Sequence, residues 1–100
     1  MRSITVEPSR LELAASKIES ANADYVRIYQ AMYADVDKMS ISWKGKDNTM
    51  FTSQIKSFED DLREISIIML QYADFLRNSA RAYRETQDEM YQRANHLRTV

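Results

Sequence analysis

The sequence contains no cysteine, and in 100 residues it has only one glycine, one proline and one histidine. Without cysteine there is no disulfide framework, no thiolate zinc site and no cysteine nucleophile. A single glycine and a single proline are too few for the closely spaced turns of a small all-β domain. The only histidine, His96, is too isolated for a metal site or a catalytic triad. These absences predict an all-α protein that is not an enzyme, with no catalytic residue, no cofactor and no metal.

The charge balance and the apolar runs exclude further classes of protein. Fourteen Lys and Arg residues face fifteen Asp and Glu residues, which gives a formal net charge of −1. Nucleic-acid-binding proteins normally carry a basic excess, so no nucleic-acid partner is expected. The longest uninterrupted apolar run, residues 67–70, is far shorter than the roughly 20 residues that span a bilayer. The N-terminus also lacks the apolar stretch of a cleavable signal peptide, so we expect neither membrane insertion nor the general secretory route.

Two long segments on either side of residues 42–46 carry the pattern of amphipathic helices. Their apolar or small residues recur at alternating intervals of four and three, a heptad pattern typical of packed helices. In the first segment these positions are Leu11, Ala15, Ile18, Asn22, Tyr25, Tyr29, Met32, Val36 and Met39, and in the second they are Phe51, Ile55, Phe58, Leu62, Ile65, Met69, Tyr72 and Leu76. We predict one domain: a helix over about 8–41, a turn at 42–46, a helix over about 47–83 and a frayed or helical tail at 84–100.

Both helices have apolar faces too wide for a single contact. Such faces favour an antiparallel two-helix hairpin that dimerises into a four-helix bundle. The candidate residues of the hairpin or dimer interface are Leu11, Ile18, Tyr25, Tyr29, Met32, Phe51, Phe58, Leu62, Ile65, Met69, Tyr72 and Leu76. Asn22 is the polar exception in the first helix: it either fixes the register of the pair or lies at the edge of the contact.

The residues between the two helices carry the most specific motif of the chain. Trp43 is the only tryptophan, and it stands two positions before Gly45, the only glycine, at the only break between the helices. Glycine allows the chain to reverse, and the indole can cover the end of the bundle. A Trp-x-Gly turn in the middle of a cysteine-free, two-helix chain of 100 residues resembles the WXG-motif, or ESAT-like, family of small type VII secretion substrates. Pro8 before Leu11, and Phe51 after the motif, fit the same resemblance.

Members of that family usually carry a second motif after the second helix, a tyrosine followed four positions later by an acidic residue. Here Tyr83 is followed by Gln87, so the apolar frame with Met90 and Ala94 is kept but the carboxylate is missing. The resemblance makes Tyr83 and Gln87 candidates for a secretion signal. Tyr83 also occupies a heptad position, so it is equally a candidate for the packed face of the second helix.

Charged residues elsewhere fit an ordinary solvated surface. The acidic cluster at 59–64 has no histidine, glycine turn or carbonyl-rich loop to complete a catalytic or cation site. Arg77, Arg81 and Arg84 lie along one side of the second helix, where nearby acids make phosphate binding the weaker interpretation.

The resemblance implies a non-enzymatic type VII secretion substrate, or a targeting partner for a larger secreted effector, exported as a folded hairpin dimer without a cleavable signal peptide. The implied partners are a second copy or a related helical hairpin, the type VII secretion ATPase and a larger effector toxin. Two alternatives remain open. One is a cytosolic coiled-coil adaptor with no export role, and the other is a small regulatory helical protein that binds nucleic acid, which the charge balance disfavours.

Overall fold

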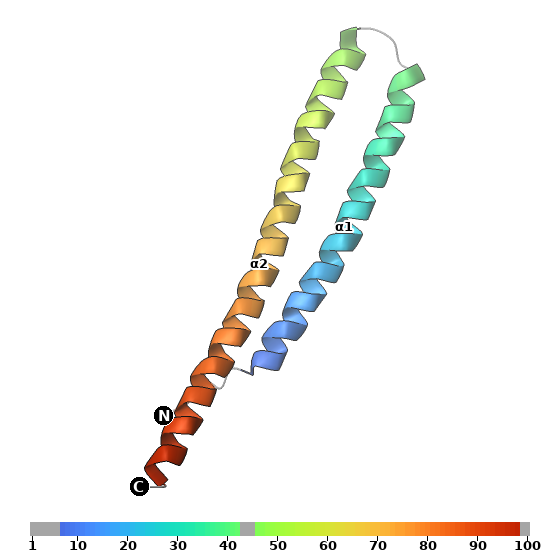
Figure 1. The fold of residues 1–100 in the computed structure, drawn as a ribbon. Coiled ribbons are helices and arrows are strands. Elements are labelled where there is room, and N and C mark those ends of the chain that lie inside the picture. The colour runs from blue at the N-terminus through green and yellow to red at the C-terminus, as the bar shows by residue number, and fades with distance from the viewer. Residues whose placement is uncertain (1–6, 43–45, 99–100) are drawn as a thin grey trace, which may run out of the picture.

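The computed structural model describes residues 7–42 and 46–98, and it shows two long antiparallel helices that lie side by side (Figure 1). Helix α1 comprises Pro8–Ser42 and helix α2 comprises Lys46–Arg98. Within the described ranges there is no strand, so the prediction of an all-α helical hairpin is confirmed. Trp43 and Gly45, which we predicted to form the turn, lie outside the described residues.

The ends of α1 show why the helix begins and stops where it does. Pro8 opens the helix at a position where its missing amide hydrogen is not needed. The carbonyl of Glu7 accepts hydrogen bonds from the amides of Arg10 and Leu11, at 3.0 and 3.4 Å. At the other end, the Ser42 hydroxyl donates to the carbonyl of Met39 at 3.0 Å, which satisfies an acceptor of the last turn.

Helix α2 is 53 residues long and continues as one helix to Arg98. The heptad pattern predicts a second helix to about residue 83 and a frayed or helical tail, and in the structure the tail is helical through Arg98. Because α1 has only 35 residues, the C-terminal part of α2 projects well beyond the first turn of α1 (Figure 1). We call residues 81–98, all of which are exposed, the overhang. Over the described residues, neither helix combines the length and the apolar character that crossing a membrane requires.

The contact between the helices is narrow, and small or polar residues fill much of it. We call the residues of each helix that face the other helix the seam. Its most buried members are Ala15, Asn22, Tyr29 and Tyr33 on α1, and Ser66, Ala73 and Ala80 on α2. Among the described residues, no large side chain is completely buried. A core of this kind leaves many large apolar side chains of the described residues exposed to solvent.

The seam of α2 differs from the heptad pattern that the sequence suggested. Half of the expected positions face α1: Ile55, Leu62, Met69 and Leu76 are half-buried. The other half are exposed, with Phe51, Phe58, Ile65 and Tyr72 at 36%, 60%, 47% and 56%. Their places in the seam are taken by the residues one position later, which are Thr52, Glu59, Ser66 and Ala73. On α1 the seam follows the expected positions as far as Tyr29 and then uses Tyr33 instead of the exposed Met32.

Candidate interaction surfaces

A set of polar contacts in the middle of the seam fixes how the two helices align. The hydroxyl of Ser66 donates to the side-chain carbonyl of Asn22 at 2.7 Å, and both residues are 7% exposed. The Tyr25 hydroxyl donates to the backbone carbonyl of Leu62 at 3.0 Å. Asn22 therefore lies inside the contact and not at its edge, because its partner is a buried residue of the other helix.

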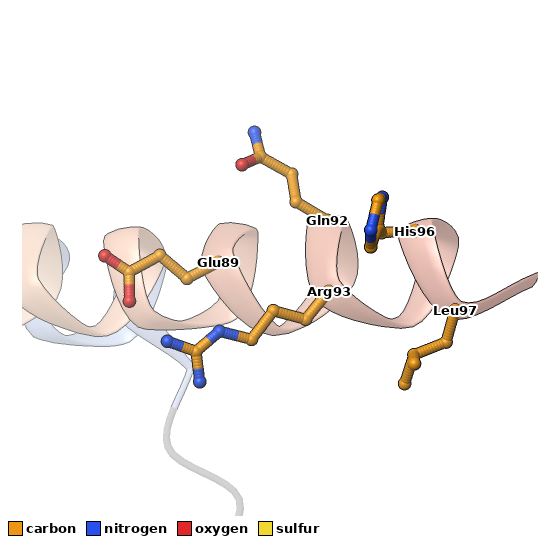
Figure 2. Close-up of a pocket in the computed structure, with 5 residues that line it drawn as sticks. All are labelled: Glu89, Gln92, Arg93, His96 and Leu97. Carbon is orange, nitrogen blue, oxygen red and sulfur yellow. The ribbon is translucent and has the colours of Figure 1, made fainter. Parts of the chain in front are cut away.

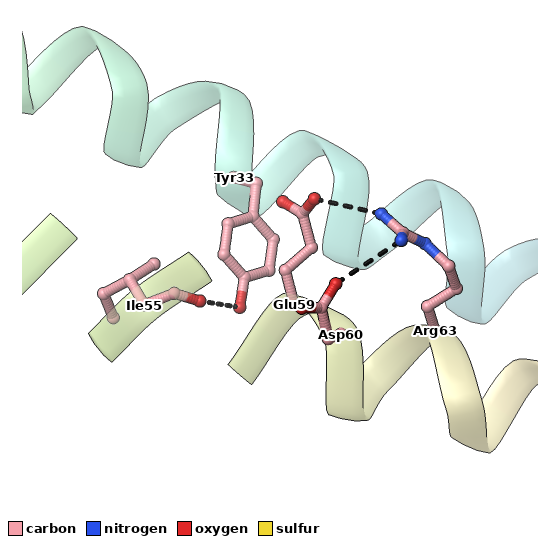
Figure 3. Close-up of polar contacts among 5 residues, drawn as sticks. All are labelled: Tyr33, Ile55, Glu59, Asp60 and Arg63. Carbon is pink, nitrogen blue, oxygen red and sulfur yellow. Dashed lines mark hydrogen bonds and ion pairs between the residues drawn. The ribbon is translucent and has the colours of Figure 1, made fainter. Parts of the chain in front are cut away.

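The loop-proximal half of the hairpin contains the acidic cluster (Figure 3). Tyr33 reaches across the seam there, and its hydroxyl donates to the Ile55 carbonyl at 2.7 Å. Burial raises the pKa of the Tyr33 phenol, and the nearby carboxylates of the cluster act in the same direction. The Arg63 guanidinium lies 3.3 Å from a Glu59 oxygen and 3.4 Å from an Asp60 oxygen. Two of the acids are thus paired within their own helix, and in the described part of the chain no group of side chains could hold a metal ion.

Two arginines of α2 pair with glutamates of α1 near the open end of the hairpin. Arg77 pairs with Glu19 and also donates to the Ser16 hydroxyl at 3.2 Å. Arg84 lies 2.5 Å from a Glu12 oxygen. The hydrogen bond from Arg84 lowers the pKa of Glu12, and the same bond raises the pKa of Arg84. These pairs occupy one flank of the seam and account for the two arginines without a phosphate or nucleic-acid ligand.

The other flank of the seam carries a continuous exposed set of apolar side chains on α2. We call this set the apolar stripe; it consists of Phe51, Phe58, Ile65, Ile68, Tyr72 and Phe75. The rings of Tyr72 and Phe75 stack with their centroids 6.3 Å apart. Ile68 and Phe75 are 57% and 62% exposed. Exposed apolar surface of this extent on one face of a protein commonly marks a contact with another molecule.

The geometry of the ion pairs shows that α1 contributes to the same face. Glu19 lies four positions after the buried Ala15, and Arg77 lies four positions after the buried Ala73. Because Glu19 and Arg77 form an ion pair, the flank of α1 and the flank of α2 that they occupy lie on the same side of the hairpin. Residues that directly precede a seam residue lie on the opposite flank. Ile28 and Met32 of α1 are in that position, at 67% and 47% exposed, as are all six members of the stripe on α2. One side of the hairpin therefore carries the ion pairs between the helices, and the other carries the apolar stripe.

The candidate secretion signal lies at the root of the overhang. Tyr83 is 39% exposed and Gln87 is exposed, on the turns of α2 at and just beyond the last ion pair with α1, the one between Arg84 and Glu12. Further along, Met90 and Leu97 are 65% and 75% exposed. Tyr83 thus continues the spacing of the seam but does not have the burial of a core residue.

A shallow hollow lies on the overhang itself (Figure 2). Its lining residues are Glu89, Gln92, Arg93, His96 and Leu97, all from two turns of α2. Because a single helix forms it, the hollow is open to solvent and has no enclosing wall from α1. The hollow therefore lacks the enclosing walls of a small-ligand site.

Sequence reasoning missed two features of these surfaces. It did not find Ser66 as the partner of Asn22, and it did not find the arginine–glutamate pairs across the helices. The sequence did contain a signal for the arginine–glutamate pairs, because Glu12 and Glu19 are seven residues apart, as are Arg77 and Arg84. In an antiparallel pair of helices, such spacings bring opposite charges together at successive heptads.

Solved structures with the same fold include forms of EsxB, a secreted protein from Bacillus anthracis str. Sterne. One structure of that protein superimposes with a TM-score of 0.74 at 18% sequence identity, and the match covers 87% of this chain and 99% of EsxB. A form of EsxB with a single substitution matches with a TM-score of 0.73 at 20% identity, over 87% of this chain and 96% of the other. At these identities the likeness shows the helical-hairpin fold. Among curated protein sequences, none matches this chain.

A family model gives the more specific result. The model WXG100, described as proteins of 100 residues with WXG, matches residues 3–98. The match spans both helices and the Trp43–Gly45 motif between them, and it agrees with the resemblance that the sequence showed. The chain therefore belongs to the WXG100 family of small helical-hairpin proteins.

Proposed function

We propose that this protein is a non-enzymatic substrate of a type VII secretion system, or a targeting partner for a larger secreted effector, and that it is exported as a folded hairpin dimer. The observation that carries the proposal is the WXG100 match over residues 3–98. Members of this family are small secreted helical proteins and are generally not enzymes. EsxB, which has the same fold, is described as a secreted protein.

The apolar side of the hairpin supports the dimer. Proteins of this family commonly form dimers of helical hairpins. A second hairpin placed on the stripe would remove large side chains such as Phe58 and Phe75 from water, each of them now about 60% exposed. The partner is a second copy or a related hairpin, and either one would complete a four-helix bundle.

The overhang supports a role in recognition by the secretion machinery. Tyr83 and Gln87 lie on helix turns that contribute nothing to the hairpin core, so a receptor can reach them without unfolding the protein. We propose that these turns contact the type VII secretion ATPase, and that export proceeds without cleavage of a signal peptide. Trp43 and Gly45 would form the turn that gives the exported unit its hairpin shape.

A cytosolic coiled-coil adaptor is the alternative function. The apolar stripe would serve such a protein equally well, because it fits any helical partner. Export separates the two functions, since an adaptor has no reason to leave the cell.

The test compares culture supernatants from a host with an intact type VII secretion ATPase and from the same host with an inactivated ATPase. We expect full-length protein in the first supernatant and none in the second, with a cytosolic marker absent from both. Mass spectrometry of the exported chain should find its first residues intact. Equal amounts in both supernatants, or retention in both, would contradict the secretion proposal and favour the adaptor.

A further inference from the structure

The heptad spacing of the contact between α1 and α2 continues past the end of α1. On α2 the seam alternates intervals of three and four from Thr52 to Ala80. The same intervals lead on through the overhang to a set of residues that we call the overhang seam: Tyr83, Gln87, Met90, Ala94 and Leu97. All of them are exposed, because α1 begins at Pro8 and covers nothing beyond the root of the overhang.

Large apolar side chains in the overhang gather at one heptad position. Tyr83, Met90 and Leu97 are seven residues apart and continue the line of Met69 and Leu76. Apart from Tyr91, the rest of the overhang is polar, charged or alanine. A helix that water surrounds on all sides gains nothing from an apolar line at heptad spacing, whereas a helix that packs against another helix requires one.

The position of α1 defines the direction of a helix that would cover this line. Glu12, in the second turn of α1, reaches Arg84 at the root of the overhang. A helix on the overhang seam would therefore continue the line of α1, with its C-terminal end toward Pro8 and its N-terminal end toward Arg98. The 18 residues of the overhang offer it about 27 Å, or five turns.

Arginines lie beside the overhang seam, as they do beside the seam of the hairpin. Arg77 and Arg84 occupy successive heptads and pair with glutamates of α1. The same heptad position returns at Arg98, while Arg93 lies on the opposite flank, beside the hollow (Figure 2). A covering helix with carboxylates on its flanks would pair with these two arginines as Glu12 and Glu19 pair with theirs.

We propose that the overhang seam is the docking site for an amphipathic α-helix of a partner protein, which has apolar residues at heptad spacing, carboxylates on its flanks and the same direction as α1. The proposal rests on the proposed role of the overhang in recognition and specifies the chemistry of the partner helix that would bind there. The site is distinct from the apolar stripe: stripe residues such as Ile65 and Tyr72 directly precede seam residues and lie on the flank of α2. A dimer through the stripe therefore leaves the overhang seam open.

The test uses the full-length protein and a synthetic peptide probe of about 18 residues, with leucine at the two apolar heptad positions and glutamate on the flanks. A control peptide has the same composition with its leucines spread around the helix. We expect the probe, but not the control peptide, to slow amide exchange at 83–97 by about tenfold or more. Met90→Glu should weaken binding of the probe by about tenfold or more, whereas Gln92→Glu, which adds the same charge on the far face, should change it by less than about twofold.

The direction of the helix can be tested because the chain has no cysteine. With Arg98→Cys, a disulfide should form to a probe with cysteine at its N-terminus and not to one with cysteine at its C-terminus. Protection at the apolar stripe instead of the overhang would overturn the proposal, as would equal weakening by Met90→Glu and Gln92→Glu. Concentration-dependent protection of 83–97 without any probe would identify a second copy as the occupant and would also overturn it.

The two proposals fail separately. The probe measurement is made on purified protein and does not depend on export. Loss of probe binding with normal ATPase-dependent export would reject the docking helix and retain the secretion proposal. Probe binding as expected, with no export from either host, would reject the secretion proposal and retain the docking helix.

Discussion

At the scale of single residues, the pair of Asn22 and Ser66 determines which positions of the two helices meet. Sliding α2 by one heptad would place Asn22 opposite Glu59 or Ala73, and Ser66 would lose its acceptor. A buried polar group without a partner costs about 1–3 kcal/mol. In a seam with so few large apolar contacts, that cost is large enough to select one register among those that the heptad pattern allows.

Removal of this hydrogen bond gives a direct prediction. Asn22→Ala should lower the free energy of unfolding by about 1–3 kcal/mol, because the Ser66 hydroxyl stays buried without its acceptor. The double variant with Ser66→Ala should lose less than the sum of the two single variants, with a coupling of about 0.5–1.5 kcal/mol. Urea denaturation measures all three. As a control, Ser20→Ala, at an exposed position of the same helix, should change the free energy of unfolding by less than about 0.5 kcal/mol. Strictly additive losses of stability at Asn22 and Ser66 would show that the pair does not hold the register.

At the scale of the helices, the sequence predicted the elements well and the seam of α2 only in half of its positions. The helices follow from Pro8, from the lack of other breaks and from the heptad spacing. On α2, however, two heptad frames have four positions in common, which are Ile55, Leu62, Met69 and Leu76. The frames differ at the positions between these four, which go either to large apolar residues or to the small and polar residues one position later. Hydrophobicity alone favours the large residues.

The size of the α1 side chains explains why the other frame faces the partner helix. Tyr29 and Tyr33 project from α1 into the contact, and they are 9% and 7% exposed. Their rings meet edge to face with centroids 6.5 Å apart, which fills the loop-proximal half of the seam. Further along, Ala73 and Ala80 have no exposed surface, and small residues there allow the helices to approach closely. Which frame is buried thus depends on the fit between two helices, and the heptad pattern of one helix does not contain that information.

The overhang yields a prediction at the scale of an element. Deletion of residues 85–100 keeps the Glu12–Arg84 pair and removes no seam residue that α1 contacts, so the free energy of unfolding should change by less than about 1 kcal/mol. Export should be lost, because the proposed recognition turns are gone. In the intact protein, amides at 85–98 should exchange faster than those at 50–76, since α1 does not pack against this part of α2.

A substitution at Gln87 separates recognition from folding within the same element. Gln87→Glu restores the acid that the family motif carries, on an exposed turn where the change leaves the core untouched. Export should therefore be unchanged or stronger, because a carboxylate makes a stronger contact with a receptor arginine or lysine than an amide does. Slow exchange at 85–98, or unfolding of the shortened chain, would show that the overhang belongs to the stable core and would reject its role as a recognition segment.

At the scale of the whole molecule, the hairpin has two unlike sides, and this asymmetry determines how it can assemble. One side carries the ion pairs to Glu12 and Glu19, with the exposed Leu70 on the same flank. The side with the apolar stripe has large side chains in water along much of α2. Two hairpins that met through their stripes would bury apolar area from four helices, whereas contact through the charged sides would cost desolvation of ion pairs for little gain. The stripe is therefore the face through which we expect the dimer to form.

Two isoleucines of α2 provide a matched test of that face. Ile65 lies in the stripe and Ile67 lies outside it, almost on the opposite side of the helix, yet they are 47% and 48% exposed. Ile65→Asp should convert the dimer to a monomer in light scattering while circular dichroism stays helical, because the new charge would be buried in the interface. Ile67→Asp makes the same chemical change in water and should leave the dimer intact. The stripe is not a dimer interface if the unmodified protein is a cooperatively folded monomer at micromolar concentration, both alone and with a related hairpin. Equal dissociation of the dimer by both variants would place the interface elsewhere on α2.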